Sequence, residues 1–183
     1  RSTLFPYTTL FRSLRQKDTE ARWTKKNNTS YYGYKGHYKI DAKSKFLKNY
    51  GISTANVHDS QMLDSLLEES DEAQTLWADS AYTGARQEKT MEKYKVLGQI
   101  NEKGSKGKPL TEVQKANNRE KSRIRARVEH VFGFMEQNMG GMCIRAIGMV
   151  RAKGLIGLKC LAYNLFRIGQ LERSIGGRAP KWV

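Results

Sequence analysis

The chain has 183 residues, the size of one compact domain, and its content of 38% hydrophobic and 10% aromatic residues excludes wholesale disorder. No apolar run approaches the roughly 20 residues that span a bilayer, and two cysteines exclude a disulfide scaffold, so we expect a cytoplasmic protein with no membrane partner. The 33 lysines and arginines outnumber the 18 aspartates and glutamates and give a net charge of +15, which adds no folding stability and indicates a polyanionic partner such as nucleic acid.

The first residues do not read as part of a domain. Residues 1–13 are R-S-T-L-F-P-Y-T-T-L-F-R-S, in which Thr-Leu-Phe occurs twice. This string resembles a translated sequencing adaptor, so we interpret it as an artefact; a natural edge strand is the alternative. The biological sequence is then expected to begin near Leu14, as a fragment truncated on its N-terminal side. Residues 14–30 are polar and basic and are predicted to form a solvated arm or linker.

A β-hairpin is predicted next. Two aromatic and β-branched runs, at residues 31–42 and 46–55, flank the polar turn Lys43-Ser44-Lys45. Aromatic residues at alternating positions are typical of a strand, and Gly36 is a candidate β-bulge.

Short helices and strands should alternate after the hairpin. Leucine spacing predicts a helix over residues 60–69 with Asp59 as its N-cap. Residues 75–82 form a short apolar run that is typical of a buried strand. A polar helix over 84–94 and a strand over 96–100 follow.

Two longer helices complete the chain. The first should run from Thr111 to Met139, and the second over residues 149–171. The order β-β-α-β-α-β-α-α indicates an α/β fold. We expect the domain to occupy residues 31–172, with a C-terminal tail at 173–183. The apolar stripe predicted for the first helix consists of Ile124, Val128, Val131 or Phe132, and Met135.

Two carboxylates are candidates for metal chemistry. Asp79 ends a predicted strand, at the sheet edge where open α/β folds bind ligands. Glu129 lies beside the apolar stripe of the long helix, and so near the sheet. Two acids drawn together repel each other unless a divalent cation lies between them, and Mg²⁺ prefers such oxygen ligands. The alternatives are that Asp79 caps the following turn and that Glu129 pairs with Arg125.

A run of basic residues predicts a surface that binds DNA. Nine lysines and arginines lie between Lys103 and Arg127, against two glutamates. Solvated helix faces usually alternate in sign, so phosphate binding is the favoured interpretation and a solvated face the alternative. Lys25 and Lys26 follow Trp23 and form a second candidate contact with DNA. The candidate DNA-binding residues of the long helix are Arg119, Lys121, Arg123, Arg125 and Arg127.

Four segments, taken in order, resemble one known family. They are D-T-E-A-R-W-T-K-K-N-N-T-S-Y-Y-G-Y-K-G-H, S-T-A-N-V-H-D-S, L-W-A-D-S-A-Y and N-R-E-K-S-R-I-R-A-R-V-E-H-V-F-G. From about Gln16 to Leu171 the chain is similar to the C-terminal part of DDE transposases of the insertion-sequence-5 group. The resemblance implies an RNase H-like mixed sheet flanked by helices, and cutting and joining of DNA at the ends of a mobile element.

The resemblance also implies site residues, cofactors and partners. Asp79 in W-A-D would be the second acid of the catalytic triad, and Glu129 in R-A-R-V-E-H the third; both would be metal ligands for a pair of Mg²⁺ or Mn²⁺ ions. The partners would be double-stranded DNA at terminal inverted repeats and target sites, and further copies of the protein in a synaptic complex. The location would be the bacterial cytoplasm, in association with the nucleoid.

One part of the family pattern is absent. The first acid of the family lies upstream of R-W-T-K-K, on the first core strand, and this chain contains neither. The fragment is therefore expected to be catalytically incomplete. Ser122 and Glu136 stand where the family has Tyr and Lys. Two rival functions remain open: a DNA-binding module without catalysis, and an RNase H-like nuclease that cleaves without joining strands.

Overall fold

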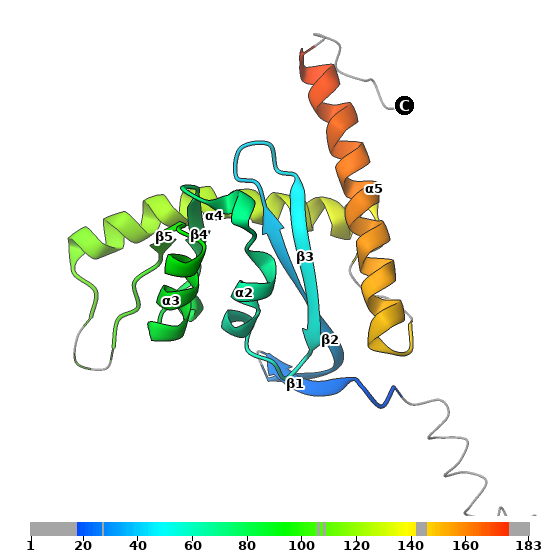
Figure 1. Ribbon diagram of the computed structural model, residues 1–183, viewed down its shortest axis with the longest axis horizontal. Coiled ribbons are helices and arrows are strands. Elements are labelled where there is room, and N and C mark those ends of the chain that lie inside the picture. Colours follow the sequence, from blue (N-terminus) through cyan, green and yellow to red (C-terminus); the bar gives the residue numbers. More distant parts are fainter. Residues whose placement is uncertain (1–17, 27, 106, 108, 142–145, 176–183) are drawn as a thin grey trace, which may run out of the picture.

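The structure is a computed structural model that describes residues 18–26, 28–105, 107, 109–141 and 146–175 (Figure 1). The adaptor-like segment 1–13 lies outside the described residues. So do the start of the predicted arm and residues 176–183 of the predicted tail.

An antiparallel sheet opens the fold. Strand β2 (Thr29–Ile40) pairs with β3 (Leu47–Thr54), from Tyr34 opposite Thr54 to Ile40 opposite Leu47. The predicted hairpin is thus confirmed. Its turn is held by Asp41, whose carboxylate accepts a hydrogen bond from the backbone N–H of Ser44 at 2.6 Å.

Strand β1 (Arg22–Lys26) corrects the prediction of an arm for that part of residues 14–30. It pairs antiparallel with the first five residues of β2, and Trp23 lies opposite Tyr32. The segment is polar because its side chains are largely exposed. Its backbone groups that face β2 are satisfied by the ladder.

The predicted bulge at Gly36 is also wrong. The register shift falls between Lys39 and Ile40. Gly36 serves a different purpose: a Cβ at this position would collide with the ring of Tyr38, which lies on the same face of the strand.

The helix predicted over residues 60–69 is broken. The 3-10 helix η1 (Asp59–Met62) leads into a single α-helical turn, α2 (Leu63–Leu66), and Leu67 is extended. A second 3-10 helix, η2 (Glu69–Asp71), follows.

The correct and incorrect parts of that prediction have separate causes. The leucine spacing did identify the buried face, because Leu63, Leu66 and Leu67 are all buried. The helix still ends at Leu66, because Asp71 accepts a hydrogen bond from the N–H of Glu68 and forms a separate turn. The N-cap of η1 is His58, not Asp59.

A parallel strand pair forms a second sheet. Strand β4 (Thr75–Ala78) pairs with β5 (Leu97–Ile100), and the connection contains η3 (Ser80–Tyr82) and α3 (Ala85–Lys93). Within the described part of the chain, this pair does not join the β1–β2–β3 sheet. The mixed α/β architecture agrees with the RNase H-like domain expected, with its strands in two sheets.

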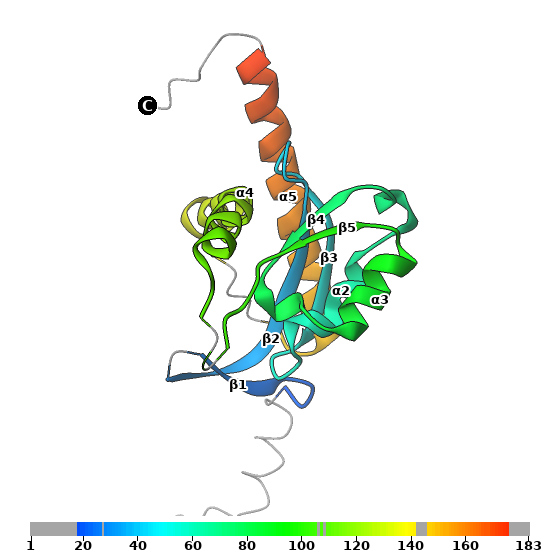
Figure 2. The ribbon, with the colours of Figure 1, turned by 90° about the vertical axis from the view of Figure 1, so that its left-hand side faces the viewer.

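Two long helices complete the structure. Helix α4 (Glu112–Asn138) begins at a capping box, in which Thr111 and Gln114 exchange side-chain-to-backbone hydrogen bonds. Helix α5 (Met149–Ile175) runs four residues past its predicted end, into the predicted tail. Figure 2 shows α4 on one side of the sheets and α2 and α3 on the other. No described helix has the length and apolar character needed to cross a membrane.

Two hydrophobic clusters hold these layers together. Val131 and Met135 of α4 are fully buried, as the predicted stripe requires, and pack with α5 against the β2–β3 sheet. The other cluster, Leu63, Leu67 and Val96, lies beneath α3. Helix α5 is also fixed to the start of β3, since the Asn164 amide bonds both the N–H of Leu47, at 3.0 Å, and its carbonyl, at 2.9 Å.

Candidate functional site

Asp79 stands immediately after the last residue of β4. Its side chain is 56% exposed. One carboxylate oxygen, Oδ1, accepts a hydrogen bond from the backbone N–H of Ser80 at 2.7 Å, so the turn-capping alternative describes part of what Asp79 does. The other oxygen, Oδ2, is directed to α4 and lies 3.5 Å from a guanidinium nitrogen of Arg125.

The ion pair between Asp79 and Arg125 brings two distant segments together at one place. Glu129 is four residues after Arg125 and therefore lies one turn further along the same face of α4. Glu129 is exposed, and its side chain forms no hydrogen bond or ion pair with another described residue. The alternative pairing of Glu129 with Arg125 is not observed, since Arg125 pairs with Asp79 instead.

The donor chemistry of these two residues suits a hard divalent cation. Both are exposed carboxylates, and oxygen ligands of this kind are what Mg²⁺ and Mn²⁺ take in proteins. No three acidic, histidine or cysteine side chains gather into a metal-binding group among the residues that the structure describes. Asp79 and Glu129 therefore fit part of a metal site.

Tyr82 is a site neighbour that the sequence reasoning missed. Its half-buried hydroxyl has a raised pKa, chiefly because of burial and also because of the negative charges of Asp59 and Asp79, while Arg125 acts in the opposite direction. The phenol thus stays protonated near neutral pH. Tyr82 follows Asp79 by three residues. Its position in the turn directly after a strand-end acid is the sequence signal that could have identified it.

Apart from Arg125, which pairs with Asp79, the candidate DNA-binding residues of α4 fall into two groups. Arg119 and Arg123 are exposed, one turn apart, and form no hydrogen bond or ion pair with any described residue. Lys121 and Arg127 instead bond backbone carbonyls: the ammonium of Lys121 donates to Ile100 at 2.9 Å, and the guanidinium of Arg127 to Ala42 at 2.8 Å. The second group fixes α4 to the ends of strands β5 and β2.

The second basic cluster lies on β1. Lys25 is exposed on the strand, on the same face as Trp23. The backbone of Lys26 pairs with Thr29, and its side chain is outside the described part.

Comparisons with known proteins identify the family of the chain. The chain matches the family described as "Transposase DDE domain" over residues 5–165. It is also 31% identical over 151 residues to the transposase for insertion sequence element IS1106 of Neisseria meningitidis serogroup B, which covers 82% of this chain.

The matched stretch spans about half of that relative, 52% of its length. No solved structure matches the chain. The family match includes residues 5–13 of the adaptor-like segment, whose interpretation stays a prediction. Because that match covers most of the sequence, with Asp79 and Glu129 inside it, the chain belongs to the transposase DDE domain family.

Proposed function

We propose that this chain provides two of the three catalytic acids of an insertion-sequence transposase of the insertion-sequence-5 group, which cuts and joins DNA at the ends of its element. The observation that best supports this proposal is the ion pair of Asp79 with Arg125. It brings a strand-end carboxylate to the helix that bears Glu129 and the exposed arginines. We further propose that the intact protein acts on double-stranded DNA in the bacterial cytoplasm as a homo-oligomer.

Asp79 and Glu129 are the proposed metal ligands. Bound Mg²⁺ or Mn²⁺, two ions in the intact site, would supply the activation of a water or 3′-hydroxyl and the stabilisation of the leaving oxygen. Arg119 and Arg123 are placed to hold phosphates, since their charges have no other described partner. Lys121, Arg125 and Arg127 add positive charge to the same helix.

A third acid has to come from outside the described residues. Cavities of about 500 Å³ and 310 Å³ both border Thr75 and Trp77 of β4. The larger reaches Lys121 and Ile124 on α4, and the smaller reaches the end of β2. We propose that the strand bearing the first acid fills this side of β4, and that the chain is inactive without it.

A cleavage assay tests this function. A protein extended upstream to include the first acid should nick element-end DNA when Mg²⁺ or Mn²⁺ is present and then join the freed 3′-hydroxyl to target DNA; the present chain should bind without nicking. Asp79→Asn and Glu129→Gln should each lower the cleavage rate of the extended protein by about 100-fold or more, because metal ions contribute several kcal/mol to such reactions. Asp64→Asn, an exposed carboxylate on α2, is the matched control and should retain activity.

Two results would contradict the assignment. If the Asp79→Asn variant cleaves DNA at the rate of the parent protein, Asp79 is not a catalytic acid. Cleavage without strand joining would indicate a nuclease.

A DNA-binding module without catalysis is the second candidate. The exposed Arg119 and Arg123 favour it, together with the lack of a three-acid group among the described residues. Binding without any metal-dependent cleavage in the extended protein would establish it.

A further inference from the structure

The β1–β2 ribbon is an unusual place for large aromatic side chains. Strand β1 pairs only with Thr29–Gly33 of β2, and β3 pairs with β2 only from Tyr34 onward. The first part of β2 and β1 therefore form a two-stranded ribbon beyond the β2–β3 pair. Such ribbons are marginally stable alone and gain stability by burying side chains.

The rings of this ribbon are not buried. Trp23 is 65% exposed, Tyr31 is 53% exposed and Tyr32 is 47% exposed. Trp23 and Tyr32 are directly opposite on one face, with ring centroids 5.1 Å apart and planes tilted by 49°. Isolated exposed aromatics are ordinary, but the paired rings of Trp23 and Tyr32 form an exposed surface on one face that can bind a ligand, whereas Tyr31 lies on the opposite face.

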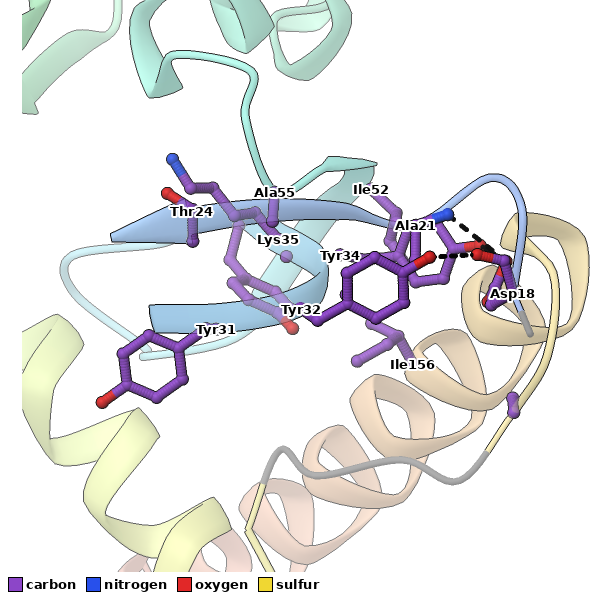
Figure 3. A pocket seen from close by; sticks show the side chains of 14 residues that line it. Asp18, Ala21, Thr24, Tyr31, Tyr32, Tyr34, Lys35, Ile52, Ala55 and Ile156 are labelled. Atoms are coloured by element: carbon purple, nitrogen blue, oxygen red, sulfur yellow. Dashed lines mark hydrogen bonds between the residues drawn. The ribbon is translucent and has the colours of Figure 1, made fainter. Parts of the chain in front are cut away.

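Tyr32 is held at its edge, which leaves its ring in a fixed position. Its hydroxyl donates a hydrogen bond to the carbonyl of Asp18. The carboxylate of Asp18 in turn accepts a hydrogen bond from the Tyr34 hydroxyl at 2.7 Å (Figure 3) and another from the N–H of Gly148 at 2.9 Å. The ring therefore pays little conformational entropy when a flat partner stacks against it.

The surroundings of the rings are open and carry charges of both signs, with Asp18 and Lys35 lining the adjoining cavity. A cavity of about 410 Å³ adjoins the ribbon and is lined by Tyr31, Tyr32 and Tyr34. Figure 3 shows Tyr31 extending from the ribbon toward α4. Lys25 is exposed on the face that carries Trp23 and Tyr32. An exposed ammonium beside stacked rings complements a ligand that alternates flat bases with phosphates.

We propose that Trp23 and Tyr32 stack against unpaired bases of DNA, while Lys25 binds a neighbouring phosphate. This rests on the proposed function and adds a ligand class to it: a single-stranded tail or frayed end next to the duplex held by α4. Paired bases inside a duplex present only their edges to a protein. Aromatic side chains can stack on the face of a base only when that base is unpaired and unstacked. In Figure 2 β1 and the start of β2 extend toward the side of the molecule that carries α4, so one DNA end can reach both.

Fluorescence anisotropy with two DNA probes tests the proposal on the present chain. One probe is a blunt duplex, and the other is the same duplex with roughly five unpaired nucleotides at one end. The tail should tighten binding about tenfold, and Trp23→Ala should remove most of that gain while blunt-duplex affinity stays within about twofold. Trp23→Phe should keep most of the gain, because it retains a ring. Leu161→Ala, an equally exposed large side chain on α5, should keep all of it.

A spectroscopic readout covers the case in which Trp23→Ala does not fold. Adding a single-stranded oligonucleotide should quench tryptophan fluorescence of the unaltered chain, and the quenching should disappear in Trp23→Phe. A blunt duplex that binds as tightly as the tailed one would overturn the stacking proposal and leave the proposed function intact. If neither probe binds, both proposals fail. A tail effect that persists in Trp23→Ala would place the unpaired bases elsewhere.

Discussion

His37 and Ser53 form a polar pair inside the hydrophobic part of the β2–β3 sheet. Both are 6% exposed, and Nε2 of His37 lies 2.8 Å from Oγ of Ser53. Burial lowers the pKa of His37 below its usual value of 6.5; the negative charge of Asp59 opposes this shift and the positive charge of Lys35 adds to it. The imidazole is therefore neutral in the folded protein at pH 7.

This burial makes stability depend on pH. Below pH 6.5 the unfolded chain takes up a proton at His37 that the folded chain refuses, so the stability present above that pH declines as the pH falls, by up to about 1.4 kcal/mol per unit. His37→Gln removes the titration and should flatten the curve. Urea unfolding of both proteins between pH 7.5 and 5 measures the difference. Parallel curves would show that His37 is not buried in its neutral form.

At this scale the sequence identified candidate residues better than it identified their partners. Asp79 was found from its place after an apolar run, and the structure puts it there. Its contact with Arg125 spans 46 positions, which no local pattern encodes. Lys121 and Arg127 belong to the same basic run as Arg119 and Arg123, so only the fold shows that they bond carbonyls.

Among the elements, the junction between residues 18–21 and α5 was the least expected. Asp18 bonds the N–H of Gly148, and Glu20 bonds the N–H of Met149 at 2.6 Å. Two carboxylates thus satisfy backbone donors at the start of α5, where the helix dipole favours negative charge. Burial acts to raise the pKa of Asp18, but its hydrogen bonds, led by that from Gly148, hold the pKa below its usual value.

Removing this cap should weaken the docking of α5. Asp18→Ala is expected to lower the free energy of unfolding by about 1 to 2 kcal/mol, the range for a lost N-cap. Glu92→Ala, an exposed acid on α3 without a described partner, should change it by less than about 0.5 kcal/mol. The difference should vanish as the pH falls through the lowered pKa of Asp18, because the protonated carboxyl loses its charge. Equal effects of the two substitutions would mean that the cap contributes nothing.

Elements with strong periodicity were predicted well, and those decided by context were not. Helices α3, α4 and α5 and strands β2 and β3 were found from their residue spacing. The region of α2 was misjudged because Asp71 draws the chain into a separate turn. Strand β1 was missed because a ribbon with two solvated faces lacks the apolar alternation that marks half-buried strands.

At the scale of the whole molecule, the salt dependence of DNA binding can show which basic residues contact DNA. Helix α4 carries the unpartnered arginines, and α3 lies on the other side of the sheets (Figure 2). If α4 binds DNA, Arg119→Ala combined with Arg123→Ala should reduce the slope of log affinity against log salt concentration by about 2, since each phosphate contact contributes about 0.9.

The matched control removes the same charge from α3. Arg86→Ala combined with Lys89→Ala lowers the net charge equally, and both residues are exposed. The slope should then be almost unchanged in a salt titration against duplex DNA. The same loss of slope in both double variants would show that binding follows net charge alone and not the position of α4.

The α/β class and the order of elements could be predicted from sequence, because they depend on local periodicity. The arrangement of the strands in two sheets could not, because pairing between distant strands is set by tertiary contacts. Recognition of the family depended on four ordered motifs, whose residues the structure distributes over β1, β2, β3, η1, β4, η3 and α4.

The contact of Asn164 with Leu47 bears on solubility. Strand β3 is the last strand of its sheet, and a terminal strand offers unpaired amide groups that recruit other chains into aggregates. One carboxamide imitates the peptide group of an adjoining strand and occupies the first of these positions. A helix rather than another strand thus occupies the first position of that border, and the edge is protected there from pairing with another chain.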